Sequence, residues 1–133
     1  MSASPSHEAF ALGIDPTELV YCRGFALHAD GRYAEAAEAF RVMLQIAPTD
    51  ERGWLALGDC HEKVGQERVA LEIYGAGTVA AQPAPRCLIS QFRILYDLGC
   101  FTEADTVLCD AELLAADDEQ LSRIVSDERR VRP

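Results

Sequence analysis

The sequence predicts an all-α protein built from three tandem helix pairs, and two observations carry that prediction. First, Gly31, Gly65 and Gly99 are spaced by 34 residues, and an alanine follows each of them five residues later. Second, the apolar residues between these markers recur every three or four positions, which is the period of an amphipathic helix. Helical units repeated at such a step stack on their neighbours to bury their apolar faces. We therefore expect three helix pairs in a right-handed superhelix.

The first unit covers residues 17–50. Its first helix ends at the turn "ADG" (29–31), where Gly31 can take the left-handed conformation without a Cβ clash. The second helix starts near Tyr33 and carries Phe40 on its apolar face. The segment "APTD" (47–50) ends this helix, because Pro48 cannot continue it and Asp50 is a good N-cap for the next one.

The second and third units repeat this plan over residues 51–84 and 85–118, and "QPAP" (82–85) supplies the break between them. Small residues such as Gly24 and Gly58 are expected to let the paired helices approach closely. The bulky Phe40, Trp54 and Tyr74 are expected to fill the space between units. The third unit is the most degenerate, as expected near the end of an array.

Two short segments flank the repeats. Residues 1–16 contain a brief apolar stretch that we interpret as a helix for dimerisation or as a cover for the first unit. Residues 119–133 predict a capping helix, with a narrow apolar stripe and a basic end at Arg129, Arg130 and Arg132. The alternative for this end is a basic docking tail.

Composition limits the class of protein. A chain of 133 residues forms one domain, and its 49% hydrophobic content includes no apolar run long enough to span a membrane. The start, "MSASPSHEAF", lacks the basic and apolar regions of a signal peptide, so we expect a cytoplasmic protein without membrane insertion. The net charge of −10 disfavours nucleic-acid binding and favours a basic or amphipathic partner.

Catalytic and metal-binding patterns are not evident. Five cysteines occur without a CxxC pair, and they are expected to be reduced apolar residues rather than metal ligands. No nucleophile elbow, phosphate-binding loop or HExxH motif occurs, so we expect a protein that is not an enzyme and needs no cofactor or metal.

The first helices of stacked pairs are expected to line a concave groove for a protein partner. Three positions from each unit face this groove once the packing positions are removed: Tyr21, Phe25, His28, Leu55, Asp59, Glu62, Ile89, Arg93 and Tyr96. Tyr21 and Phe25 are aromatics that packing within the pair does not need, and an exposed aromatic patch marks a partner site. The alternative is that Phe10 and Leu12 of the N-terminal segment cover them.

The pattern resembles the tetratricopeptide repeat. The residues that match its motif are Gly24, Tyr33, Ala36, Phe40 and Pro48 in the first unit and Trp54, Leu57, Gly58, Gly65, Ala70 and Tyr74 in the second. A closer resemblance is to the class II chaperones of bacterial type III secretion, which hold hydrophobic translocator proteins before export. The segments similar to that family's three units are "LVYCRGFALHADGRYAEAAEAFRVM" (19–43), "ERGWLALGDCHEKVGQERVALEIYGAG" (51–77) and "APRCLISQFRILYDLGCFTEADTVLCDAELLA" (84–115).

The resemblance implies a cytoplasmic chaperone that works without ATP and grips an extended translocator segment bearing spaced Pro and Leu side chains. It assigns Tyr21 and Phe25 as pocket walls, whereas His28 departs from the aromatic usual at its position. It also implies a homodimer, although the family's dimerising helix is longer than the 16 residues that precede the repeats here. The alternatives are a general repeat scaffold and a chaperone for another component of the secretion apparatus.

Overall fold

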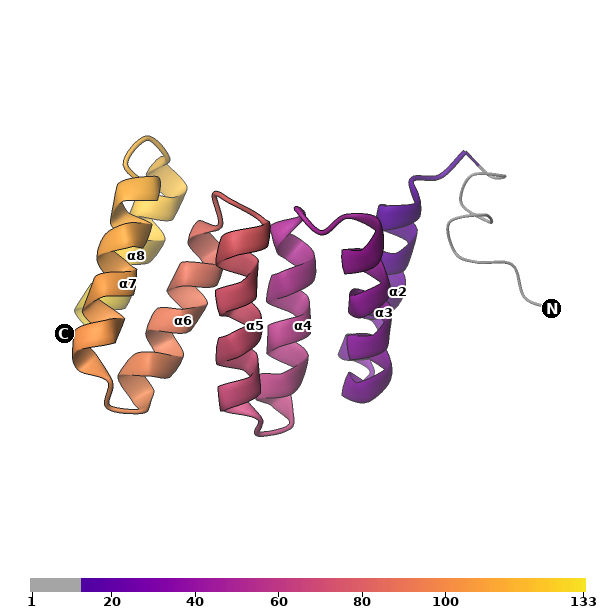
Figure 1. Cartoon of the computed structure of the whole chain (residues 1–133), viewed down its shortest axis with the longest axis horizontal. Coiled ribbons are helices and arrows are strands. Elements are labelled where there is room, and N and C mark those ends of the chain that lie inside the picture. Colours follow the sequence, from indigo (N-terminus) through magenta and orange to yellow (C-terminus); the bar gives the residue numbers. More distant parts are fainter. Residues whose placement is uncertain (1–12) are drawn as a thin grey trace.

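The computed structural model describes residues 13–133, and these form seven α-helices and no strand. The helices are α2 (Pro16–Ala29), α3 (Tyr33–Ile46), α4 (Glu51–Lys63), α5 (Glu67–Ala80), α6 (Pro85–Asp97), α7 (Phe101–Leu114) and α8 (Glu119–Val131). They stand side by side in a row, with the first pair at one end and α8 at the other (Figure 1). The all-α class is confirmed. The apolar residues of the N-terminal segment that were expected to dimerise or to cover the groove, Phe10 and Leu12, lie outside the described residues.

Within each pair the turn between the helices has the same geometry. The glycines at positions 31, 65 and 99 have φ angles of 78°, 79° and 83°, which is the left-handed region. At the second turn the N–H of Gly65 donates to the carbonyl of Glu62 at 3.0 Å, and the N–H of Gln66 donates to the carbonyl of His61 at 2.8 Å. These two bonds form a Schellman motif, which satisfies the last carbonyls of the helix. The 34-residue step therefore repeats a specific turn as well as a composition.

Aspartates cap three of the helices at their N-termini. The side chains of Asp15, Asp50 and Asp118 accept hydrogen bonds from the backbone N–H groups of Thr17, Arg52 and Leu121, at 2.8, 3.1 and 3.0 Å. Each bond satisfies a donor that has no partner inside its helix. The expectation that Asp50 caps the second unit is confirmed.

Helix α6 is capped by a neighbouring helix instead. Ala84 precedes α6 and has no side-chain acceptor. Glu51, the first residue of α4, fills this role, because its Oε2 accepts from the N–H groups of Arg86 at 3.0 Å and Cys87 at 3.1 Å. Burial raises the pKa of Glu51 despite these two donors. The start of one unit therefore organises the start of the next.

The first two pairs are closed by a ring that lies on a glycine. A Cβ on Gly24 would come within 2.6 Å of the Phe40 ring, and a Cβ on Gly58 would overlap the ring of Tyr74. Phe40 and Tyr74 are 1% and 2% exposed. Each ring thus packs on the glycine of its own pair, and it also belongs to an apolar cluster that includes residues of the next unit, as expected for a ring between units.

The third pair reverses the sizes at the same two positions. Phe92 stands on α6 where the other units have glycine, and Leu108 stands on α7 where they have an aromatic ring. Phe92 and Leu108 are 3% and 1% exposed, so both lie in the core. In the third pair the large side chain is thus on the first helix and the smaller one on the second, and the space between the helices is still filled.

Helix α8 covers the end of the stack. Val125 is 2% exposed and lies in one apolar cluster with residues of α6 and α7, joined by the half-buried Leu121 and Ile124. Arg129, in the basic stretch, bonds to Glu112 at 2.6 Å and to Asp105 at 3.1 Å. The predicted capping helix is confirmed, and it directs basic groups to acids of its own chain.

Over residues 13–133, none of the helices is both long enough and apolar enough to cross a membrane.

Gly58→Phe should lower the free energy of unfolding by at least about 1–3 kcal/mol, because the new ring needs the volume that Tyr74 occupies. The double variant Gly58→Phe/Tyr74→Leu copies the arrangement of the third pair. It should therefore be more stable than the sum of the two single variants predicts. Chemical denaturation of all four proteins measures this coupling, and strictly additive losses would show that the two positions do not share volume.

Glu51→Ala should destabilise the chain by about 1–2 kcal/mol, because two N–H donors of α6 lose their acceptor. Glu51→Gln keeps a side-chain oxygen and removes a carboxylate whose charged form is penalised by burial. Its stability at pH 7 should equal or exceed that of the natural chain. A large loss for both variants in thermal melts would mean that the charge, and not the acceptor, stabilises the junction.

Candidate partner-binding site

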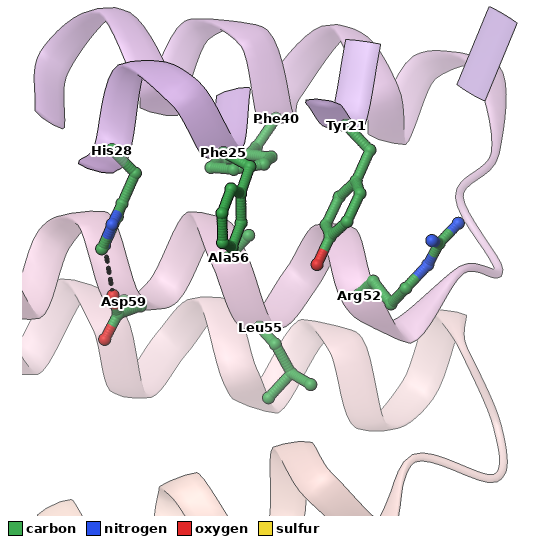
Figure 2. A pocket seen from close by; sticks show the side chains of 8 residues that line it. All are labelled: Tyr21, Phe25, His28, Phe40, Arg52, Leu55, Ala56 and Asp59. Carbon is green, nitrogen blue, oxygen red and sulfur yellow. Dashed lines mark hydrogen bonds and ion pairs between the residues drawn. The ribbon is translucent and has the colours of Figure 1, made fainter. Parts of the chain in front are cut away.

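A pocket of about 250 Å³ lies between α2 and α4, with one ring of α3 at its base. The residues that line it are Tyr21, Phe25, His28, Phe40, Arg52, Leu55, Ala56 and Asp59. Figure 2 shows the side chains of α2 pointing toward those of α4 across this space. Five of the nine positions expected to face a groove are brought together here: Tyr21, Phe25, His28, Leu55 and Asp59.

Helix α2 supplies one wall because its three lining residues fall on a single helical face. Tyr21, Phe25 and His28 are separated by four and three positions, the spacing of neighbours on a helix surface. The Tyr21 ring is half-buried and lies 6.2 Å from the Phe40 ring and 6.4 Å from the Phe25 ring, between centroids. Phe25 is 62% exposed. Tyr21 is thus packed against its neighbours, while most of the apolar surface of Phe25 is exposed.

Arg52 closes one end of the pocket. Its guanidinium carbon lies 4.5 Å from the centre of the Tyr21 ring, a cation–π geometry. Its Nη2 pairs with Asp50 at 2.9 Å and with Glu18 at 2.5 Å. The hydrogen bond from Arg52 holds the pKa of Asp50 below its usual value. Arg52 is therefore fixed against the ring and already neutralised by carboxylates of its own chain.

His28 and Asp59 close the opposite end. The Nε2 of His28 lies 2.6 Å from Oδ2 of Asp59, and this bond joins α2 to α4 (Figure 2). The imidazole also meets the Tyr33 ring edge-on, with 5.1 Å between centroids. Contacts on two sides thus orient His28, the residue that departs from the usual aromatic.

Ile89 and Glu62, two of the four remaining expected positions, lie outside this pocket. Ile89 is 3% exposed and belongs to the apolar cluster shared by α6, α7 and α8, so it presents no surface to a partner. This corrects its assignment as a groove-facing residue. Glu62 accepts a hydrogen bond from the Tyr74 hydroxyl at 3.2 Å, and burial raises the pKa of Glu62.

Arg93 and Tyr96 also do not line the pocket. Arg93 donates from Nε to Glu128 of α8 at 2.6 Å. Tyr96 lies against Phe101, with 4.9 Å between ring centroids. The third unit's expected positions thus take part in contacts inside the chain.

Three lining residues lie outside the nine positions assigned to the groove: Phe40, Arg52 and Ala56. Phe40 was interpreted as a packing residue, and its ring both packs in the core and lines the pocket. A signal for Arg52 was present, since it follows Glu18 by the 34-residue step and opposite charges at that spacing meet on adjacent first helices.

The site offers contact surface and hydrogen bonds rather than a reactive group. Burial raises the pKa of Cys60 to about 11 and that of Cys87 to about 12, so these thiols stay protonated at neutral pH. All five cysteines are free. Among the residues that the structure describes, no three histidine, cysteine or acidic side chains are grouped to hold a metal ion.

Comparison with known proteins points to one group. Residues 27–88 match the tetratricopeptide repeat family. The chain is 27% identical over 110 residues to the low calcium response locus protein H of Yersinia pestis, a match that covers 83% of this chain and 66% of that protein.

Solved structures agree with this result. The Yersinia enterocolitica type III secretion chaperone SycD, in complex with a peptide of the translocator YopD, has a TM-score of 0.74 and 28% identity. The same translocator chaperone in an alternative dimer has a TM-score of 0.75 and 28% identity. Each match covers 86% of this chain and 89% of the other. Part of the chain, residues 27–88, thus matches the tetratricopeptide repeat, and the chain resembles, in sequence and fold, the translocator chaperones of type III secretion.

Proposed function

We propose that this chain is a type III secretion chaperone that binds a hydrophobic translocator protein and keeps it export-competent. The observation that carries the proposal is the pocket between α2 and α4, where Phe25 is 62% exposed beside a preformed apolar floor. A large aromatic exposed at the mouth of a pocket is typical of a protein-binding hot spot. The similarity to a chaperone solved with a translocator peptide supports the same function.

The client segment is proposed to bind in an extended form, with spaced Pro and Leu side chains entering the pocket. The helices that form the walls are held by turns, caps and close contacts in the described structure, so the chaperone pays little ordering cost on binding. The client meanwhile stays unfolded. A net charge of −10 on the chaperone keeps such a complex dispersed in water.

Two further parts of the proposal follow from the same reasoning. The chain acts in the cytoplasm, where it holds the client before export. It acts by binding alone, without catalysis, because the pocket is lined by apolar side chains and by charged groups that are already paired, His28 with Asp59 and Arg52 with Glu18.

Phe25→Ala should weaken binding of a fluorescent translocator peptide, such as the YopD segment, by about 2 kcal/mol or roughly 30-fold, the size of a hot-spot truncation. The thermal midpoint should hardly change, because the Phe25 side chain is mostly exposed. Tyr21→Ala should weaken binding too, but it should also lower stability since Tyr21 packs on Phe40.

Phe101→Ala is the matched control. It removes an aromatic ring of similar exposure, 58%, that lies outside the pocket. Titration and melting of the three variants separate binding from folding. Loss of affinity in Phe101→Ala but not in Phe25→Ala would place the client elsewhere on the molecule.

A further inference from the structure

The pocket between α2 and α4 has an uneven charge that the proposed function does not use. Three carboxylates, those of Glu18, Asp50 and Asp59, lie around it with a single guanidinium, that of Arg52. Two of these carboxylates bond to Arg52, so that end of the pocket has no spare positive charge. An acidic client side chain would therefore find no partner there.

Asp59 is the accessible charge at the other end. Its side chain is 39% exposed, and among residues 13–133 His28 is its hydrogen-bond partner, through Oδ2. A carboxylate has two oxygens and about four acceptor sites, so Oδ1 can accept a bond from a cation of the client. Glu62 lies one helical turn further along α4 and adds to the negative potential at this end.

The dimensions of the pocket set the distance between an apolar anchor and this carboxylate. Tyr21 and His28 are seven residues apart on α2, which is about 10 Å along the helix axis. An extended chain covers that length in about three residues. An apolar side chain held between Tyr21 and Phe25 thus places the client residue two or three positions away beside Asp59.

Resting on the proposed function, we infer that the pocket selects client segments in which a lysine or arginine lies two or three residues from the apolar anchor, and that Asp59 binds this cation. The apolar part of the pocket binds the anchor side chain. Asp59, held by His28, binds the cation of the neighbouring client residue. Asp59 is a specificity-determining residue of the site.

The test uses variants of the YopD peptide in which residues two and three positions on either side of each leucine are changed to Lys, Ala or Glu. At low salt and about pH 8, the Lys peptides should bind about five- to tenfold more tightly than the Glu peptides. The ratio should shrink at about 0.5 M salt, because salt screens a partly exposed pair.

Two protein variants with the same net charge locate the effect. Asp59→Asn keeps a hydrogen-bond acceptor for His28, and in it the Lys-to-Glu ratio should fall below about twofold. Asp110→Asn removes an exposed carboxylate outside the pocket and should leave the ratio unchanged.

Equal affinity of the Lys and Glu peptides, with the Ala peptide still bound, would overturn this inference and leave the proposed function standing. If none of the peptides binds, both this inference and the proposed function are wrong. Binding that appears only after deletion of residues 1–12 would assign the pocket to the chain's own N-terminal segment. A dimer in sedimentation that Phe25→Ala dissolves would assign it to a second copy. Either of these last results would also overturn the inference.

Discussion

The close approach of the two helices in each pair is the contact on which the rest of the structure depends. In the first two pairs it exists because a ring fills the space that a missing Cβ leaves at Gly24 and Gly58. That contact fixes the distance between the helices, and the repeated Schellman turn fixes the angle at which the chain returns. Together they present the first helix of each pair to the first helix of the next.

Contacts between successive first helices then convert the stack into a frame for a pocket. Glu51 caps α6, Arg52 pairs with Glu18, and His28 bonds to Asp59, each joining residues 31 to 36 apart in sequence. Individually, exposed ion pairs of this kind contribute little to stability. The pairs of Arg52 with Glu18 and of His28 with Asp59 are nonetheless informative, because they lie at the two ends of the pocket and hold Tyr21 and Asp59 in place before any partner arrives.

The fold could be predicted from the sequence because the residues that define it act locally or at a constant step. Gly31 sets a turn within six residues, and Asp50 caps the helix that it precedes. The candidate site could be predicted only in part. Ile89 was expected to face the groove by analogy with the first two units, but α8 packs on α6 and buries it. Helix α8 begins 34 residues after α6 and so continues the step of the first helices, but the apolar stripe with which it helps to cover Ile89 is particular to this last helix. The pairing of Arg52 with Glu18 agrees with the 34-residue step, but the place of its guanidinium over the Tyr21 ring depends on a side-chain conformation that helical periodicity does not encode.

The two ends of the described array differ in a way that explains where the pocket lies. At the C-terminal end, Arg93 forms an ion pair with Glu128 of α8, and the neighbouring apolar face of α6 is covered. The aromatic and charged groups of the third unit therefore make contacts within the chain. Between α2 and α4 the corresponding groups still leave Phe25 mostly exposed and Asp59 accessible. An exposed apolar ring beside an accessible carboxylate, on a chain with a net charge of −10, favours a partner that brings an apolar side chain and a cation together. The proposed binding of a client and the proposed selection of its charge therefore both fall on the first two units.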